Sequence, residues 1–291
     1  MKTAETRQVA IEDLPLVAHG GQAEIYDYGD GKVLRVAKRP QDFDRIRYEY
    51  SVYSILAESG ISVPRAYELV TVDGAPAIIM DKVAGSTMMS GIARNPLQLT
   101  TRARELARLH LGLREFNVAS GLTPTKSKAE FCINHSQILS DHTKQTVLEV
   151  LKGLPDGDAL CHGDFHPGNI ICNGGKNYII DWVGASRGDF HADMAHTYIL
   201  LRVVPRVPHV SGIMHFMQKR VGRSMADHYL AGISSEISLD YEVFSKWVLI
   251  NAAERTYHGL DSEQEHLQLF IGKYLEILAH GGNQAELYRA V

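Results

Sequence analysis

A short polar stretch, LCHGDFHPGNII at residues 160–171, concentrates side chains that can do chemistry. It holds Asp164 and Asn169, five positions apart and enclosed between two apolar edges. A further aspartate, Asp181, follows twelve residues after Asn169, at the end of the apolar run NYII. A loop carboxylate can accept a proton from a hydroxyl group, and carboxylate and amide oxygens are ligands that suit Mg²⁺. The spacing therefore predicts a site that combines a proton acceptor with a divalent metal.

Phosphoryl transfer needs this combination, because the protein supplies mostly positioning and charge stabilisation to that reaction. The interval from Asp164 to Asn169 is also that of the kinase catalytic loop. Two other interpretations are weaker. A solvated Pro-Gly surface turn does not predict Asp181, and a zinc site made of His162, His166 and a cysteine leaves Asn169 and Asp181 without a role.

The segments HGDFHPGN and IIDW closely resemble the aminoglycoside phosphotransferase and choline kinase group. In these kinase-like enzymes the catalytic loop reads HGDxHxxN, and the metal aspartate ends a strand that reads I-D-F/W. Three further segments are similar to this family: AGSTM after IIMDKV, LARLH at 106–110 and RGDFHADMAH at 187–196. The resemblance covers roughly residues 16–200 and leaves the C-terminal third without a recognisable motif.

The resemblance implies a role for each polar residue of the motif. Asp164 is expected to be the catalytic base, and Asn169 and Asp181 are expected to be the Mg²⁺ ligands. His162 is expected to brace the loop. Asp189 and Asp193, in the following segment, are expected to support the loop or cap the next helix.

The spacing of apolar residues along the chain changes near residues 82–85, where we expect a hinge. Before this point, apolar runs on both sides of Gly29–Gly31 and of Asp73–Gly74 predict two β-hairpins, with a helix between them that ends at Gly60. After it, helical spacing of apolar residues dominates, interrupted by short strands within 160–183. The helical segments are 99–113, 241–256 and 263–278. With the resemblance, this predicts an α+β, two-lobed protein-kinase-like fold, with a small β-rich nucleotide-binding N-lobe at 1–83. The larger, mostly helical C-lobe at 84–291 would carry the catalytic loop and the substrate-binding region.

The N-lobe should hold the nucleotide. Gly20 and Gly21 in HGGQAEIY let the backbone approach phosphate closely, although a Gly-Gly pair on its own is more often an ordinary turn. The segment resembles the looser GGxxNxxY pattern of the family, with Glu24 in place of the asparagine. At the hinge, backbone groups of Asp81 and Val83 are expected to contact the adenine edge.

A kinase-like N-lobe also needs a cation on its third strand, paired with a glutamate on the next helix. Arg35 and Lys38 compete for this role, and three positions along a strand place them on opposite faces. We favour Arg35 paired with Glu49, because Lys38 lies where the strand should end. The alternative is that Arg35 and Glu49 are solvated surface charges.

Composition excludes several classes of protein. The 291 residues carry a formal net charge of −4 without blocks of Lys and Arg, so we expect no nucleic-acid partner. No signal peptide or long apolar window is present, so we expect no membrane partner. Three cysteines without CxxC spacing fit reduced thiols and a cytoplasmic location.

The expected reaction is Mg²⁺-dependent transfer of the γ-phosphoryl group of ATP or GTP to a hydroxyl of a small molecule. An aminoglycoside or another antibiotic is the first expectation for the acceptor, and a metabolite such as choline, a sugar or homoserine is the alternative. An atypical protein kinase and a nucleotide-binding pseudoenzyme are less favoured. The C-terminal acidic residues give no preference, since basic residues are interspersed among them. These are Glu254, Asp261, Glu263 and Glu265.

Overall fold

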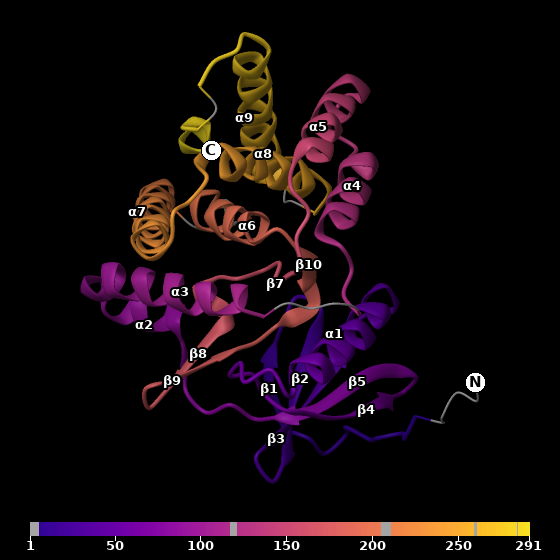
Figure 1. Cartoon of the computed structure of the whole chain (residues 1–291). Coiled ribbons are helices and arrows are strands. Elements are labelled where there is room, and N and C mark those ends of the chain that lie inside the picture. The colour runs from indigo at the N-terminus through magenta and orange to yellow at the C-terminus, as the bar shows by residue number, and fades with distance from the viewer. Residues whose placement is uncertain (1–5, 117–120, 205–210, 259–260, 284) are drawn as a thin grey trace. The chain divides into compact units, whose positions relative to one another are not determined.

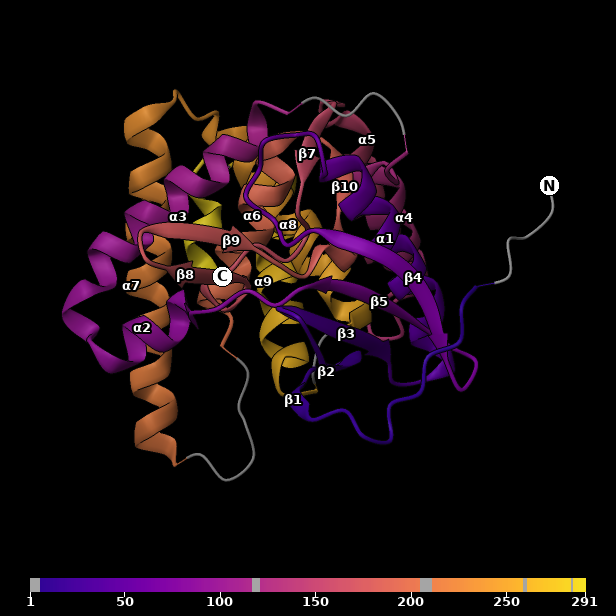
Figure 2. The same ribbon diagram turned by 90° about the horizontal axis from the view of Figure 1, so that it is seen from below.

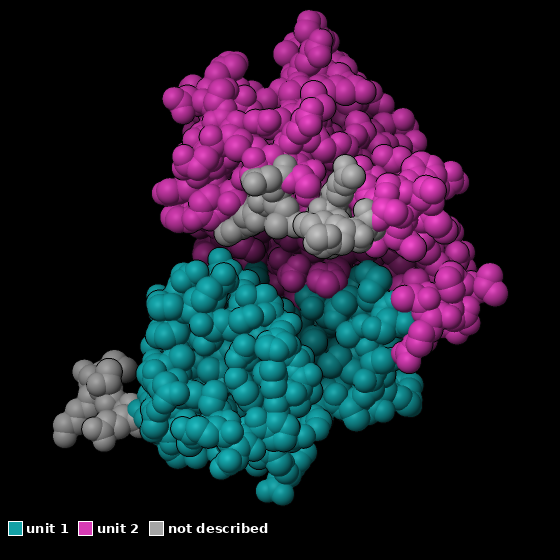
Figure 3. Space-filling view, turned by 180° about the vertical axis from the view of Figure 1, so that it is seen from behind, with its two compact units in different colours: residues 1–91, 167–185 teal, residues 92–166, 186–291 magenta. Residues whose placement is uncertain are grey.

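The computed structural model describes residues 6–116, 121–204, 211–258, 261–283 and 285–291. Contacts divide the chain into two compact units, shown in teal and magenta in Figure 3. Unit 1 comprises Met1–Gly91 and Pro167–Ala185, and unit 2 comprises Ile92–His166 and Ser186–Val291. None of the helices in the described ranges is long and apolar enough to cross a bilayer.

Unit 1 is built on a five-stranded antiparallel sheet, with strand order β1-β2-β3-β5-β4, which Figure 2 shows. Its turns are the predicted ones: Asp30 and Gly31, and Asp73 and Gly74, all have positive φ, as tight hairpin turns require. The strands are β1 (Leu16–His19), β2 (Ala23–Gly29), β3 (Lys32–Ala37), β4 (Ala66–Val72) and β5 (Ala75–Asp81).

The two faces of β3 have different partners, because side chains alternate along a strand. Leu34 and Val36 belong to a buried apolar cluster with residues of β4 and β5. Arg35 lies on the opposite face and contacts α1 (Phe43–Leu56). This helix follows the short η1 (Pro40–Asp42) and occupies most of the segment predicted as helical.

A second, three-stranded sheet completes unit 1, in the order β6-β8-β9. Ser86 pairs with Cys172, so residues 84–91 and 167–185 group with each other. The backbone N–H of Ile179 donates to the Ser62 carbonyl, and α1 contacts η4, which joins these segments to the first part of the chain. The predicted boundary between residues 83 and 84 rests on composition, which carries no information on this long-range pairing. The elements are β6 (Ser86–Thr87), α2 (Met88–Arg94), η3 (Pro167–Asn169), β8 (Ile170–Asn173), β9 (Lys176–Ile179) and η4 (Trp182–Gly184).

Unit 2 is mostly helical, as predicted. Figure 1 shows α8 packed among α4, α5, α6 and α9, and α8 buries Phe244, Trp247 and Leu249. The helices are α3 (Leu99–Arg114), α4 (Thr125–His135), α5 (Asp141–Gly153), α6 (Phe190–Arg202), α7 (Gly212–Glu236), α8 (Tyr241–His258) and α9 (Asp261–Ala279), with the short η2 (Pro96–Gln98) and η5 (Leu287–Ala290). A two-stranded ribbon of β7 (Ala159–Cys161) and β10 (Ser186–Gly188) precedes and follows the polar loop. The α+β class is therefore confirmed.

Candidate active site

The loop that carries Asp164 is anchored by one buried carboxylate. Asp193 of α6, which is 2% exposed, accepts hydrogen bonds from the backbone N–H groups of His162 (2.6 Å) and Gly163 (2.8 Å). Its Oδ2 also lies 2.9 Å from Nε2 of His110 on α3. Gly163 has φ 73°, a conformation that favours glycine. These bonds hold the loop in one conformation.

The electrostatics of Asp193 suit this anchoring role. Burial raises its pKa, but the charge and hydrogen bond of His110, together with His162 and the Gly163 N–H, outweigh burial and hold the pKa well below its usual range. Asp193 therefore stays ionised and accepts hydrogen bonds. His110 is held in turn by the hydroxyl of Tyr229, 2.7 Å from its Nδ1.

Asp164 lies in unit 2 with two histidines beside it. Its backbone N–H donates to Nδ1 of His162 (3.2 Å), so His162 braces the loop in the way expected. Nε2 of His166 lies 3.7 Å from Asp164 Oδ2. Burial raises the pKa of Asp164, but the hydrogen bond and charge of His166, with charges at His196 and His162, bring it below its usual value. The carboxylate is therefore ionised at neutral pH and able to accept a proton.

Arg35 bridges two carboxylates in unit 1. Its Nε donates to Glu49 Oε2 (2.7 Å), and its Nη2 donates to Asp181 Oδ1 (2.8 Å). The Glu49 side chain is 1% exposed and that of Arg35 is 13% exposed. Burial lowers the pKa of Arg35, but the charges of Glu49 and Asp181 outweigh it and raise the pKa. The predicted Arg35–Glu49 ion pair is thus present, and it extends to Asp181.

Lys38, the competing cation, lies elsewhere: its Nζ donates to the Gly20 carbonyl (3.3 Å). Gly20 forms a tight turn with Ala23, since a Cβ at Gly20 would meet the Ala23 carbonyl oxygen at 2.9 Å. At Gly21 a Cβ would meet nothing within 4 Å. Gly20 is thus required by the turn, whereas Gly21 leaves open space next to the backbone.

Asn169 and Asp181 are brought together by the β8–β9 hairpin. The backbone N–H of Ile180 donates to the Asn169 carbonyl (3.0 Å), so the residue before Asp181 is bonded to Asn169. Asp181 has φ 65°, a left-handed conformation that falls outside the hairpin turns where the other such aspartates lie. An amide oxygen and a carboxylate held on adjacent backbone segments are a donor set that suits Mg²⁺.

Among the described residues, no group of three or more His, Cys, Asp or Glu side chains could hold a metal ion. His162, His166 and a cysteine therefore form no such group in the described part of the chain. Hard oxygen donors remain as the candidate ligands.

At the end of β5, Asp81 turns its side chain toward β4. Its carboxylate accepts hydrogen bonds from the hydroxyl of Tyr67 (2.7 Å) and from the backbone of Arg65 (3.0 Å). Val83, two residues on, is half-buried. The proposed contacts with adenine come from the backbone, so they stay a prediction.

Two contacts could not be predicted from the sequence. The motif alone gives His166 no part in the chemistry, yet its ring lies within ion-pair distance of Asp164. Tyr229 of α7 lies 119 residues from His110, and no local pattern could pair them. The motif HGDFHPGN places a histidine, His166, two residues after Asp164. This spacing is the one feature of the sequence that suggests a contact between the two side chains.

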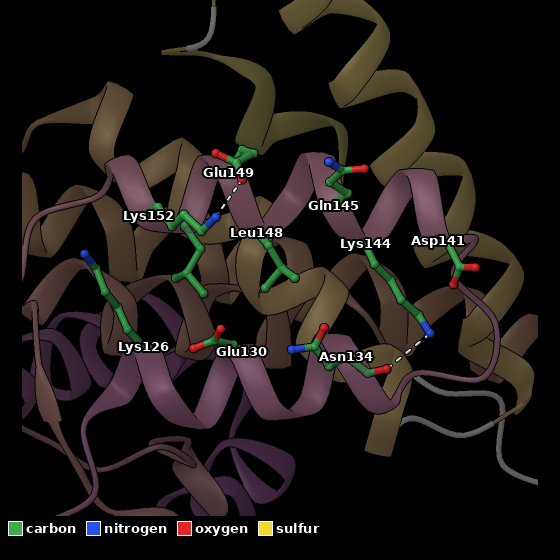
Figure 4. A pocket seen from close by; sticks show the side chains of 10 residues that line it. Lys126, Glu130, Asn134, Asp141, Lys144, Gln145, Leu148, Glu149 and Lys152 are labelled. Atoms are coloured by element: carbon green, nitrogen blue, oxygen red, sulfur yellow. Dashed lines mark hydrogen bonds and ion pairs between the residues drawn. The ribbon is translucent and has the colours of Figure 1, made fainter.

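A groove with a volume of ≈ 570 Å³ lies between α4 and α5 (Figure 4). Within the groove, Lys152 pairs with Glu149, and Lys144 donates to the Asn134 carbonyl. None of the predicted site residues lines it. The groove is therefore separate from the catalytic loop.

A sequence profile of the phosphotransferase enzyme family matches residues 16–209, which is two thirds of the chain. The protein therefore belongs to this family and is an enzyme of the phosphotransferase class. The resemblance carried by HGDFHPGN and IIDW is thereby confirmed. Among curated proteins, none matches the chain.

Solved structures similar to the chain include an aminoglycoside-3'-phosphotransferase of type VIII, with TM-score 0.60, 20% identity, and coverage of 83% of this chain and 93% of that one. The amicoumacin kinase hAmiN, in complex with AMP-PNP, Ca²⁺ and Ami, has TM-score 0.61, 14% identity, and coverage of 98% and 94%. A thermostable mutant of APH(4)-Ia, in ternary complex with AMP-PNP and hygromycin B, has TM-score 0.59, 15% identity, and coverage of 96% and 94%. These likenesses confirm the protein-kinase-like fold.

Proposed function

We propose that the protein transfers the γ-phosphoryl group of ATP or GTP, with Mg²⁺, to a hydroxyl of a small molecule. The observation that carries the proposal is the Arg35 bridge to Glu49 and Asp181. A strand cation paired with a helix glutamate, beside a metal-binding aspartate, is the arrangement that phosphoryl transfer in kinase folds requires.

In this proposal, Asp164 orients the acceptor hydroxyl and takes its proton as the oxygen attacks the γ-phosphorus. The O–H bond breaks, a new O–P bond forms, and the bond from the γ-phosphorus to the β-phosphate oxygen breaks, which leaves ADP or GDP. Asn169 and Asp181 would hold Mg²⁺, which neutralises phosphate charge when bound. His166 keeps Asp164 ionised until the hydroxyl arrives.

The remaining residues would position the nucleotide. Arg35 steadies the phosphates, because a guanidinium can fork across two oxygens without losing its charge. The Gly20–Gly21 turn covers the phosphates, and backbone groups of Asp81 and Val83 contact adenine. In this scheme residues 1–83 bind nucleotide, and residues 84–291 supply the catalytic loop and the acceptor pocket.

An aminoglycoside or related antibiotic is the first candidate for the acceptor, because similar structures are aminoglycoside and amicoumacin kinases. A metabolite alcohol of the choline, sugar or homoserine type is the second. The proposed location is the cytoplasm, which the reduced, non-disulfide state of Cys132, Cys161 and Cys172 supports. The net charge of −4 supports an enzyme that needs no nucleic-acid or anionic membrane partner.

The test is a Mg²⁺-dependent assay with ATP and GTP in parallel. The acceptor panel comprises aminoglycosides, macrolides, choline, sugars and homoserine, and mass spectrometry detects phosphate added to any of them. A product with the wild type, absent when Mg²⁺ is chelated, supports the proposal. Nucleotide binding without any product favours a pseudoenzyme, transfer of label to protein favours a protein kinase, and absence of nucleotide binding contradicts the kinase function.

A further inference from the structure

A tyrosine of α7, Tyr229, ends a chain of buried polar contacts that begins at the loop of Asp164. Helix α7 packs against α3 (Figure 1), and the Tyr229 hydroxyl lies 2.7 Å from Nδ1 of His110 on α3. On the other side of the ring, Nε2 of His110 lies 2.9 Å from Asp193 Oδ2. Tyr229 and His110 are both 0% exposed. The transfer step proposed above uses neither of them.

The His110 ring supports the loop on both sides of Asp164. Before Asp164, the carboxylate of Asp193 accepts the backbone N–H of Gly163 (2.8 Å), and His110 contacts this same carboxylate. After Asp164, the ring of Phe165 stacks on His110, with 4.1 Å between the ring centroids and 26° between the planes. The orientation of the His110 ring therefore bears on both residues that flank Asp164.

Hydrogen bonds at both ring nitrogens fix this orientation, and stacking alone cannot. Rotation of the His110 ring by 180° about its Cβ–Cγ bond keeps the ring plane, and thus the contact with Phe165, but it replaces both nitrogens by carbons. Asp193 is ionised and can only accept, so Nε2 must carry a proton. At Nδ1, burial and the charge of Asp193 raise the pKa of Tyr229 well above its usual value, so the hydroxyl stays protonated. A hydroxyl both donates and accepts, so it can bond to Nδ1 in either charge state of the ring.

We propose that Tyr229 is a positioning residue that acts on Asp164 through His110. Its hydroxyl holds the ring in the orientation that directs the Nε2 proton at Asp193, and Asp193 holds the loop backbone. This inference rests on the proposed function, in which Asp164 must meet the acceptor hydroxyl. Loss of the Tyr229 hydroxyl leaves a buried ring nitrogen without its partner, and the bond to Asp193 is then the one polar restraint on rotation of the ring.

The first test observes the ring directly and needs no acceptor. Nitrogen-15 NMR of histidine-labelled protein, with the His110 signals assigned from their loss in His110→Gln, shows which ring nitrogen carries a proton. We expect the wild type to show a protonated Nε2 whose proton exchanges slowly with water. In Tyr229→Phe this exchange should be roughly 10-fold faster, which corresponds to the loss of one buried hydrogen bond.

The second test measures hydrogen exchange at the backbone N–H groups of His162 and Gly163, which bond to Asp193. We expect roughly 10-fold faster exchange in Tyr229→Phe. Tyr274→Phe is the matched control, because it removes the same atom from a tyrosine of α9 that is 1% exposed, and it should leave both groups unchanged. In the His110→Gln background, Tyr229→Phe should add little, because its effect passes through His110.

The third test separates positioning from nucleotide binding, with water as the acceptor in Mg²⁺-dependent release of phosphate from ATP. We expect Tyr229→Phe to lower kcat roughly 3- to 30-fold. The KM for ATP should change less than about twofold, because the residues proposed to bind nucleotide belong to unit 1. An equal loss of kcat in Tyr274→Phe would show that any buried hydroxyl of unit 2 has this effect, and would contradict a positioning role.

An unprotonated Nε2 in the wild type, unchanged exchange at the two loop N–H groups, or additive effects of Tyr229→Phe and His110→Gln would overturn the inference. Thermal unfolding shows whether each variant keeps its fold, and the state of Nε2 in the wild type decides the question if Tyr229→Phe does not fold. Failure of the proposed function looks different. In that case the wild type neither releases nor transfers phosphate, while the NMR and exchange results stay as expected.

Discussion

At the scale of single residues, three charged side chains form the part of the candidate site that we propose binds nucleotide. Arg35 holds Glu49 and Asp181 together with two short hydrogen bonds. The choice of Arg35 over Lys38 follows from side-chain alternation along β3, so it could be made from the sequence. The contact to Asp181 could not, because 146 residues separate the two.

Substitution of the two competing cations separates their roles. We expect Arg35→Ala to raise the KM for nucleotide by roughly 10- to 100-fold, since it removes a phosphate-facing charge and leaves the buried Glu49 unpaired. Lys38→Ala removes a single bond to the Gly20 carbonyl and should change the KM less than about threefold. Steady-state kinetics with ATP and GTP measure both, and a larger effect at Lys38 would show that the wrong cation was assigned.

The acidic side chains of the C-terminal part also differ at this scale. Four acidic residues of the C-terminal part are equivalent in the sequence. The structure distinguishes Glu254, loosely paired beside the loop, from Glu263, which is fully engaged by Arg255. Burial and partner geometry make this distinction, and both depend on helix packing that no local pattern encodes.

At the scale of elements, α6 anchors the loop that carries Asp164. Asp189 caps this helix through the His191 N–H, and Asp193, one turn later, binds the loop backbone. Helices and hairpin turns were predictable because their spacing and turn residues are local. The grouping of residues 84–91 and 167–185 with unit 1 was not predictable, because it depends on the pairing of β6 with β8 and on the bond from Ile179 to Ser62, which are both long-range.

Asp193→Asn tests the anchor. Because the native pKa of Asp193 is depressed, its stabilising effect is present above the unfolded pKa near 4 and is lost as pH falls below it. We expect the unfolding free energy of the variant to be about 3 kcal/mol lower than that of wild type at pH 7. This difference should become smaller below about pH 4.

Urea unfolding across this pH range measures the effect, with Asp227→Asn as the exposed control in the same unit. If the difference in unfolding free energy between wild type and Asp193→Asn stays constant with pH, Asp193 is not the ionised anchor of the loop.

At the scale of the whole molecule, the residues of the proposed reaction belong to both units. Unit 2 holds Asp164 with His162 and His166, and unit 1 holds Arg35, Glu49, Asn169 and Asp181. The motif HGDFHPGN spans the point where the chain passes from one unit to the other, between His166 and Pro167. The motif therefore contributes the candidate proton acceptor Asp164 to unit 2 and one candidate metal ligand, Asn169, to unit 1.

The central claim is that Asp164 accepts the proton while Asp181 holds the metal. The most direct test measures Mg²⁺-dependent ATP binding and phosphate transfer side by side for wild type, Asp164→Asn and Asp181→Ala. We predict that Asp164→Asn binds Mg²⁺ and ATP nearly as wild type but transfers phosphate roughly 10²- to 10⁴-fold more slowly, and that Asp181→Ala loses the Mg²⁺-dependent part of ATP binding. Full activity of Asp164→Asn, or unchanged Mg²⁺ dependence of Asp181→Ala, would contradict the account.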